Sequence, residues 1–166
     1  MKRIGLLSDT HGFFDPLLRQ FFMDCDEIWH AGDIGNLETA DEIASFRPLV
    51  AVYGNVDDAR VRTVYPLHQR FKCEDVLVWL THIGGYPGNY ERSLMRELQL
   101  SPPAMFISGH SHILKVIHDP EFNLLHINPG AAGKQGFHHV RTAVRFSISG
   151  RRIHDLEVWE NDRKGY

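Results

Sequence analysis

The chain has 166 residues, eleven of which are histidine, and it carries a formal net charge of −3. This length is enough for a core of its own and predicts a single domain over residues 1–166. The sequence has neither a basic stripe nor an apolar run of membrane-spanning length, so we expect neither nucleic-acid binding nor membrane insertion.

The first predicted element is a buried strand over residues 2–8, and polar residues follow it at once. Asp9 and His11 stand two positions apart at its end, just before Gly12. A rigid strand end can aim a carboxylate and an imidazole at one point, as a metal site requires. The same pair also suits a turn whose aspartate caps the next helix, so this motif alone leaves both interpretations open.

Helices and strands are expected to alternate from there to residue 108. Apolar spacing and capping residues predict three helices, namely residues 15–24, a helix capped by Asn36 that includes Ala44, and a helix opened by Asn89 that reaches Leu98. Apolar runs predict strands over residues 27–31, 49–53, 76–81 and 104–108. Residues 68–74 are expected to pair with 76–81 as a hairpin.

From residue 113 onward the periodicity changes from helical to alternating, which indicates antiparallel strands. These strands are expected over residues 113–118, 122–127, 140–148 and 151–158, with a glycine-rich loop over residues 128–133. An alternating first part followed by antiparallel strands predicts an α/β fold. In this fold a two-layer β-sandwich is flanked by helices.

Two features bear on the cellular compartment. Cys25 and Cys73 lie in unrelated contexts, so we expect two free thiols in a reducing environment. The apolar run over residues 4–7 is too short for the core of a signal peptide. A cytoplasmic protein is therefore predicted.

Polar residues of the types that bind metals follow five of the predicted strands. They are Asp9 and His11, Asp33, Asn55, His82, and the pair His110 and His112. Ligands of α/β sheets gather outside the carboxyl ends of strands, so these seven side chains are expected to converge. Imidazole, carboxylate and amide groups without a thiol favour Mn, with Fe, Zn, Co or Ni as alternatives, over Ca or Mg. Seven ligands suit two ions about 3.5–4 Å apart if one carboxylate bridges them.

The series Asp-x-His, Gly-Asp, Gly-Asn-x-Asp, Thr-His, Gly-His-x-His and Asn-Pro-Gly, spread over residues 1–135, resembles the calcineurin-like metallophosphoesterases. It is most similar to their small bacterial and archaeal phosphodiesterase branch, and it also resembles the small subunit of the eukaryotic retromer complex. The resemblance implies the αββα metallophosphoesterase fold. It further implies one metal on Asp9, His11, Asp33 and His112 and a second on Asp33, Asn55, His82 and His110, with Asp33 as the bridge.

The function implied by this resemblance is a dinuclear-metal-dependent phosphoesterase, in the first place a phosphodiesterase that acts on a small phosphate ester. A hydroxide held between the ions would attack the phosphorus in line with the leaving oxygen. Asp33 and Asn55 would then serve catalysis as metal ligands. The alternative is a retromer-subunit-like scaffold or binding module with an idle metal site. A homo-oligomer is compatible with either function.

The chain departs from the family pattern at two positions. Many relatives carry histidine after the Asn of Gly-Asn, where this chain has Val56, and His-Gly-His where it has His82-Ile83-Gly84. The first of these histidines is the usual candidate for protonating the leaving oxygen, which valine cannot do. Activated esters are therefore the expected best substrates, unless another residue supplies the proton.

The remaining polar residues receive separate interpretations. His30 is expected to be a buried, hydrogen-bonded imidazole, and Asp57 to bond the backbone near Asn55. Lys134, His138 and His139 follow a glycine-rich stretch and could face the metals, one histidine as the missing acid and the lysine as a phosphate ligand; a solvated loop is the alternative. The histidines expected at the surface or on a sheet face are His68, His118, His126 and His154.

Overall fold

Two five-stranded sheets form the framework of the computed structural model, which describes residues 1–163. In spatial order, the first sheet contains β12 (Arg152–Asp162), β11 (Val140–Ser149), β1 (Lys2–Leu7), β2 (Glu27–His30) and β3 (Leu49–Ala51). The second contains β4 (His68–Cys73), β5 (Val76–Thr81), β8 (Met105–Ile107), β10 (Leu124–Pro129) and β9 (Leu114–Asp119).

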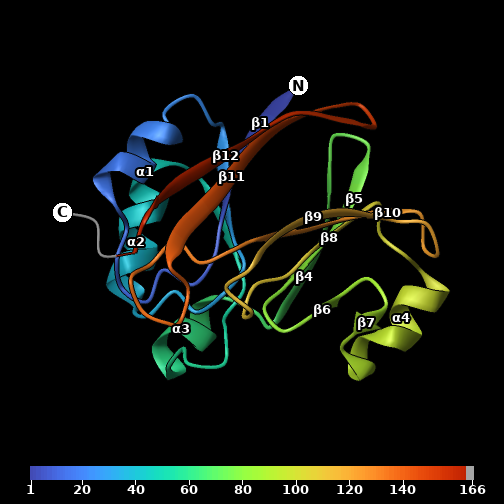
Figure 1. Ribbon diagram of the computed structural model, residues 1–166, viewed down its shortest axis with the longest axis horizontal. Helices are drawn as coiled ribbons and strands as arrows, with labels where there is room; N and C mark the ends of the chain where they lie inside the picture. Colours follow the sequence, from blue (N-terminus) through green and yellow to red (C-terminus); the bar gives the residue numbers. More distant parts are fainter. Residues whose placement is uncertain (164–166) are drawn as a thin grey trace.

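Short helices flank the two sheets, as Figure 1 shows. They are α1 (Pro16–Phe21), α2 (Leu37–Phe46), α3 (Ala59–Val64) and α4 (Met95–Leu100), the last preceded by the 3-10 turn η1 (Arg92–Leu94). The first three lie on the side of the first sheet, and α4 lies outside the second. The predicted two-layer β-sandwich flanked by helices is therefore confirmed. Within residues 1–163, no helix is long and apolar enough to cross a membrane.

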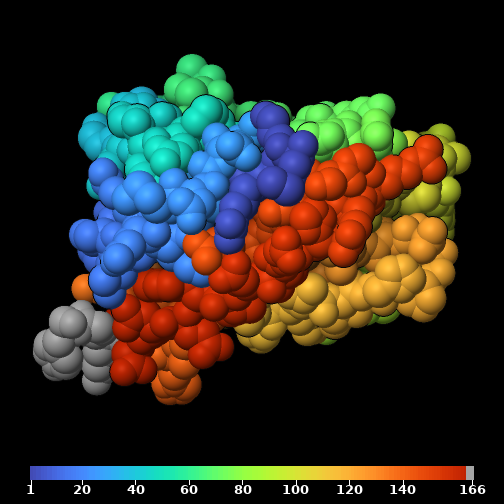
Figure 2. Space-filling model, turned by 90° about the horizontal axis from the view of Figure 1, so that it is seen from above, coloured from blue at the N-terminus to red at the C-terminus, as the bar shows by residue number. Residues whose placement is uncertain are grey.

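The strand β1 is covered on both faces, which explains its continuous apolar sequence. Leu6 packs between the two sheets with Trp29 and Phe146, whereas Leu7 packs under α1 and α2 with Leu18 and Ile43. All of these side chains are buried. Figure 2 shows β11 and β12 (red) running across one face of the molecule beside the N-terminal residues (dark blue). This long hairpin extends the first sheet beyond β1, with which β11 pairs antiparallel.

Parallel pairing within each sheet brings the functional loops together. β1, β2 and β3 run parallel in the first sheet, and β5, β8 and β10 run parallel in the second. The loops after these strands therefore leave from carboxyl ends, where ligands of α/β sheets gather. Backbone hydrogen bonds join them, since Asp9 N–H donates to the Gly32 carbonyl (3.0 Å) and Gly109 N–H to the His82 carbonyl (2.9 Å).

The helix predicted to open at Asn89 was placed too early. Residues 85–90 instead form the small hairpin of β6 (Gly85–Tyr86) and β7 (Asn89–Tyr90), and the helical residues begin after it. Pro87 and Gly88 form its two-residue turn, in which Gly88 has a φ of 86°. A left-handed residue directly before Asn89 ends any helical geometry there, because glycine adopts this conformation without strain.

Other boundaries also differ from the sequence-based prediction. The first helix ends at Phe21 rather than at residue 24, and α3 was not predicted. The strand β10 extends through Asn128 and Pro129, which pair with Lys115 and Leu114 of β9, so the loop begins later than expected. Proline is tolerated at position 129 because this residue ends the strand, where its missing backbone N–H interrupts no hydrogen bond inside the strand.

His126 lies on a face of the second sheet, as expected, but it is fully buried. Its Nδ1–H donates to the Phe106 carbonyl (3.1 Å), and burial lowers its pKa to about 4. The folded protein therefore keeps this imidazole neutral below pH 6.5, where the unfolded chain takes up a proton.

The unfolding free energy of chelator-treated protein is expected to fall as the pH drops from about 7.5 to about 5, with His126 responsible for about 2 kcal/mol of the loss. In His126→Leu, an apolar side chain replaces the imidazole, whose ring centroid lies 5.8 Å from that of Phe106, and this share of the pH dependence should disappear. Urea unfolding at both pH values measures it. An identical pH dependence in the variant and the native protein would contradict the assignment.

Candidate metal centre

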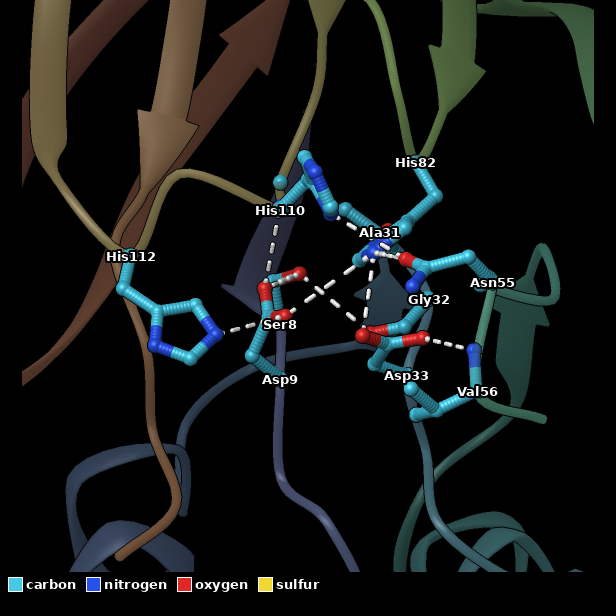
Figure 3. Close-up of polar contacts among 12 residues, drawn as sticks. Ser8, Asp9, Ala31, Gly32, Asp33, Asn55, Val56, His82, His110 and His112 are labelled. Atoms are coloured by element: carbon cyan, nitrogen blue, oxygen red, sulfur yellow. Dashed lines mark hydrogen bonds and ion pairs between the residues drawn. The ribbon is translucent and has the colours of Figure 1, made fainter. Parts of the chain in front are cut away.

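Six of the seven predicted ligands form two compact clusters. One contains Asp9, His11 and His112, the other contains Asp33, His82 and His110, and within each the ligand atoms lie within 4.8 Å of one another. Asn55 adjoins the second cluster, because its Oδ1 lies 3.1 Å from both His82 Nε2 and His110 Nδ1. Figure 3 shows the side chains of the labelled ligands converging from loops of both sheets, namely Asp9, Asp33, Asn55, His82, His110 and His112.

Each carboxylate has one oxygen held by donors and one oxygen turned toward the rings. Asp9 Oδ2 accepts from the Ser8 hydroxyl (2.6 Å) and from His110 N–H (3.2 Å). Its Oδ1 lies 3.1 Å from His112 Nε2. Sequence reasoning missed Ser8, although a polar residue that closes an apolar strand just before a candidate ligand was a usable signal.

Asp33 is arranged in the same way. Its Oδ1 accepts from Val56 N–H (3.0 Å), and its Oδ2 faces His82 Nε2 at 3.1 Å and His11 Nε2 at 3.9 Å. One oxygen of Asp33 therefore faces a ring from each cluster. Asp9 Oδ1 also lies near a ring of each cluster, at 3.8 Å from His11 Nε2 and 3.9 Å from His82 Nε2. The two clusters form one continuous centre.

The tautomers of His82 and His112 follow from their outer partners. His82 Nδ1 lies 2.7 Å from the Ala31 carbonyl, which can only accept, so Nδ1 carries the proton. His138 Nε2–H donates to the Gly133 carbonyl (2.8 Å), which leaves His138 Nδ1 to accept from His112 Nδ1–H (3.1 Å). The inner Nε2 atoms of His82 and His112 are thus lone-pair atoms when these rings are neutral.

When these two rings are neutral, the lone pairs of their Nε2 atoms point toward the oxygens of Asp9 and Asp33. Burial alone would lower the pKa of His82, but the hydrogen bond to Asp33 and the charges of Asp9 and Asp33 raise it overall. Burial likewise opposes ionisation of both carboxyls, yet the neighbouring histidines lower the pKa of Asp9 and Asp33 overall. His11 Nε2 is buried without a hydrogen-bond partner within residues 1–163. Such a donor set fits divalent cations.

Most of the candidate ligands have a strained backbone. Five of the seven adopt the left-handed region, with φ values of 54° (Asp9), 46° (His11), 54° (Asp33), 71° (His110) and 61° (His112). This conformation is unfavourable by about 1–3 kcal/mol for each residue with a Cβ, and it persists where surrounding structure enforces it. The clustering of strain at these residues supports a functional role for the loops.

Two glycines allow the ligand loops to approach closely. A Cβ on Gly54 would lie 2.0 Å from Asp33 Oδ1, and a Cβ on Gly109 would lie 2.2 Å from Ser8 Oγ. A side chain at position 54 would displace the Asp33 carboxylate itself, and one at position 109 would displace the Ser8 hydroxyl that holds Asp9. This explains in physical terms why glycine precedes Asn55 and His110.

Asp57 and His30 make hydrogen bonds next to the centre, as the sequence predicted. The buried Asp57 carboxylate accepts from the backbone N–H groups of Ile34 (3.1 Å), Gly35 (2.9 Å) and Gly54 (2.8 Å). It thereby joins the loop of Asp33 to the loop of Asn55.

His30 is buried, with Nε2 against the Thr10 hydroxyl (2.9 Å) and Nδ1 accepting from Gly32 N–H (3.1 Å). Burial lowers its pKa to about 4. Both ring nitrogens are therefore satisfied by hydrogen bonds, and His30 is a structural neighbour of the centre.

The profile of the calcineurin-like phosphoesterase superfamily domain matches residues 1–151. The chain belongs to this superfamily. It is 29% identical over 136 residues to a probable metallophosphoesterase of Methanothermobacter thermautotrophicus, covering 77% of this chain and 76% of that protein. It is also similar to the structure of Chaetomium thermophilum Vps29 (TM-score 0.77, 15% identity, 97% and 94% coverage). A structure described as a novel archaeal phosphodiesterase is similar too (TM-score 0.71, 21% identity, 95% and 99% coverage). At these identities the two solved structures show the shared fold.

In this member of the calcineurin-like superfamily, valine stands beside the centre at the position where the family resemblance predicts histidine. Val56 is 55% exposed, while its backbone N–H donates to Asp33 Oδ1. The backbone role at this position is therefore kept, and the side chain offers no proton.

The predicted substrate residues of this phosphoesterase are placed differently from one another. His138 contacts the ligand His112, whereas His139 is exposed, and its carbonyl accepts from Arg163 N–H (3.0 Å). Lys134 is exposed, and its Nζ lies 4.4 Å from the centroid of the Phe13 ring. Both nitrogens of His138 are engaged, so this ring positions His112 and is not free to act as an acid.

His138→Ala is expected to weaken Mn(II) binding about 10–100-fold, because His112 loses the acceptor that fixes its tautomer and ring orientation. Calorimetric titration of chelator-treated protein with Mn(II) measures the effect. His139→Ala is the matched control and should bind Mn(II) as the native chain does. Equal affinities for all three proteins would show that the contact between His138 and His112 has no bearing on the metal.

Proposed function

We propose that this chain is a metal-dependent phosphoesterase that uses two divalent ions and hydrolyses phosphodiesters. One ion is bound by Asp9, His11, Asp33 and His112, and the other by Asp33, Asn55, His82 and His110. The observation that carries the proposal is the convergence of four imidazole rings on two anchored carboxylates. Asp33 is proposed as the bridge because its Oδ2 faces His11 and His82, one ring from each cluster.

When bound, the two ions supply a hydroxide nucleophile at neutral pH and offset the charge that develops on the phosphoryl group. The chain contributes a rigid frame for them. Ser8 and the His110 N–H fix Asp9, the Val56 N–H fixes Asp33, and Ala31 and His138 orient His82 and His112. Nitrogen and oxygen ligands without sulfur support Mn(II) as the working metal.

Neither of the two residues considered as acids, at positions 56 and 138, can give a proton to the leaving oxygen. Val56 has none to give, and His138 is tied at both ring nitrogens. Esters with acidic leaving groups should therefore react fastest, since their oxygen leaves without protonation. The likeness to an archaeal phosphodiesterase supports a diester rather than a monoester as substrate.

The test is hydrolysis of bis-p-nitrophenyl phosphate by chelator-treated protein, with and without added Mn(II), with bound metal measured in each sample. We expect turnover only with Mn(II), and slower turnover of p-nitrophenyl phosphate, the corresponding monoester. Full metal occupancy without turnover on this easy leaving group would contradict the enzyme. It would favour a scaffold or binding module, for which the Vps29 likeness is the support.

A further inference from the structure

A cavity of about 430 Å³ opens directly beside the metal centre. Its walls are the β6–β7 hairpin, the loop that carries Gly109 and His110, and the start of β9. We call it the lysine cavity, and the residues that define it here are Tyr86, Arg92, His110, Ser111, Lys115 and Asn128. Because His110 belongs to both, a group in this cavity would adjoin the metals.

The lysine cavity has positive groups without acidic partners. Lys115 is half-buried, and its Nζ lies 3.8 Å from the centroid of the Tyr86 ring. Within residues 1–163, neither Lys115 nor Arg92 forms an ion pair, although the carboxylate of Glu91 also lines the cavity. The nearby Asp119 already accepts from the Tyr90 hydroxyl (2.5 Å) and from Glu121 N–H (2.8 Å).

A second cavity of about 390 Å³ lies on the other side of Ile83 and Glu91, which line both. It adjoins the centre through Asn55 and His82, and Tyr53 also lines it. Both cavities are large enough for an organic group of nucleoside size. A diester whose phosphorus lies at the metals has two arms, and the chain offers a cavity for each.

We propose that the lysine cavity binds a second anionic group, carried on one arm of the phosphodiester substrate, and that Lys115 is the residue that selects for it. Tyr86 is 41% exposed, and its ring provides an apolar surface for the part of the arm between the two anions. This inference rests on the proposed phosphodiesterase function. The substrate class is a diester with a nucleotide-like arm that bears an additional phosphate.

The kinetic test compares two substrates that differ only in that phosphate. They are thymidine 5′-(p-nitrophenyl phosphate) and the same ester with a 3′-phosphate, both assayed with Mn(II)-loaded protein. Native protein should favour the 3′-phosphorylated ester. Lys115→Met should lower kcat/KM about tenfold for that ester and less than about twofold for the other, because only one makes the charge-assisted contact. Lys72→Met, which alters a mainly exposed lysine paired with Asp75, is the control and should change neither value.

A binding measurement separates this inference from the proposed function. Chelator-treated native protein is titrated calorimetrically with thymidine 3′,5′-bisphosphate, and Lys115→Met should bind it about tenfold more weakly. Equal loss on both esters, or no preference of the native protein for the 3′-phosphate, would overturn the role of Lys115 while leaving the phosphodiesterase intact. If neither ester is hydrolysed, the proposed function fails, and the binding result alone decides whether the cavity takes the anion.

Discussion

Asp33→Asn is expected to lower kcat on bis-p-nitrophenyl phosphate by about a thousandfold or more, because a bridging carboxylate serves both ions. The change keeps the shape of the side chain and an oxygen that can accept from Val56 N–H. It removes the negative charge and replaces Oδ2, the atom that faces His11 and His82, by an amide group. Steady-state kinetics at saturating Mn(II) measure the loss.

Bound metal should fall together with the rate in this variant, to fewer than two Mn(II) per chain. Asp58→Asn is the matched control, since Asp58 lies close in sequence to the centre but caps α3 by accepting from Val61 N–H (3.1 Å). Asparagine is an equally good cap, so the control should keep full activity and metal content. Retention of a tenth or more of the native rate by Asp33→Asn would contradict the bridging role.

Asp57→Ala is expected to lower the unfolding free energy by about 3–5 kcal/mol, the largest effect on stability among our predictions. The buried carboxylate accepts from three backbone N–H groups, and alanine would leave all three without an acceptor in the interior. A hydrogen bond to a charged group contributes about 1.5–3 kcal/mol, and the three losses are not fully additive. Urea unfolding of chelator-treated protein measures the change.

The same variant should also bind Mn(II) more weakly, because Asp57 joins the loop that carries Asp33 to Gly54 and so to Asn55. Asp57→Asn should lose less stability than Asp57→Ala, since its single amide oxygen can still accept from some of the three backbone N–H groups. A stability loss below about 1 kcal/mol in Asp57→Ala would show that these loops are held by other contacts.

Local sequence signals account for much of the framework of the site. Asp15 and Asn36 cap helices as their positions suggested, because capping depends on one side chain and the next turn. The candidate ligands could be located because each follows an apolar strand, and parallel strands deliver their ends to one edge. The contact of Asp57 with Gly54 was also predictable, since the two residues lie only three positions apart in the chain.

Short elements and contacts between residues far apart in the chain could not be predicted from the sequence. The six-residue α3 contains three β-branched residues and is too short to show a helical period. His138 meets His112 only because the loop before β11 folds back over the centre, which made its positioning role unpredictable. The lysine cavity likewise arises where Lys115 of β9 meets Tyr86 of a hairpin that the sequence did not indicate.

The most direct test of the two-metal account is a titration of chelator-treated protein with Mn(II) in which bound metal and turnover of bis-p-nitrophenyl phosphate are measured on the same samples. The account predicts that the rate reaches its plateau only when two Mn(II) are bound per chain. A full rate with one bound Mn(II), or no turnover with two, would contradict it.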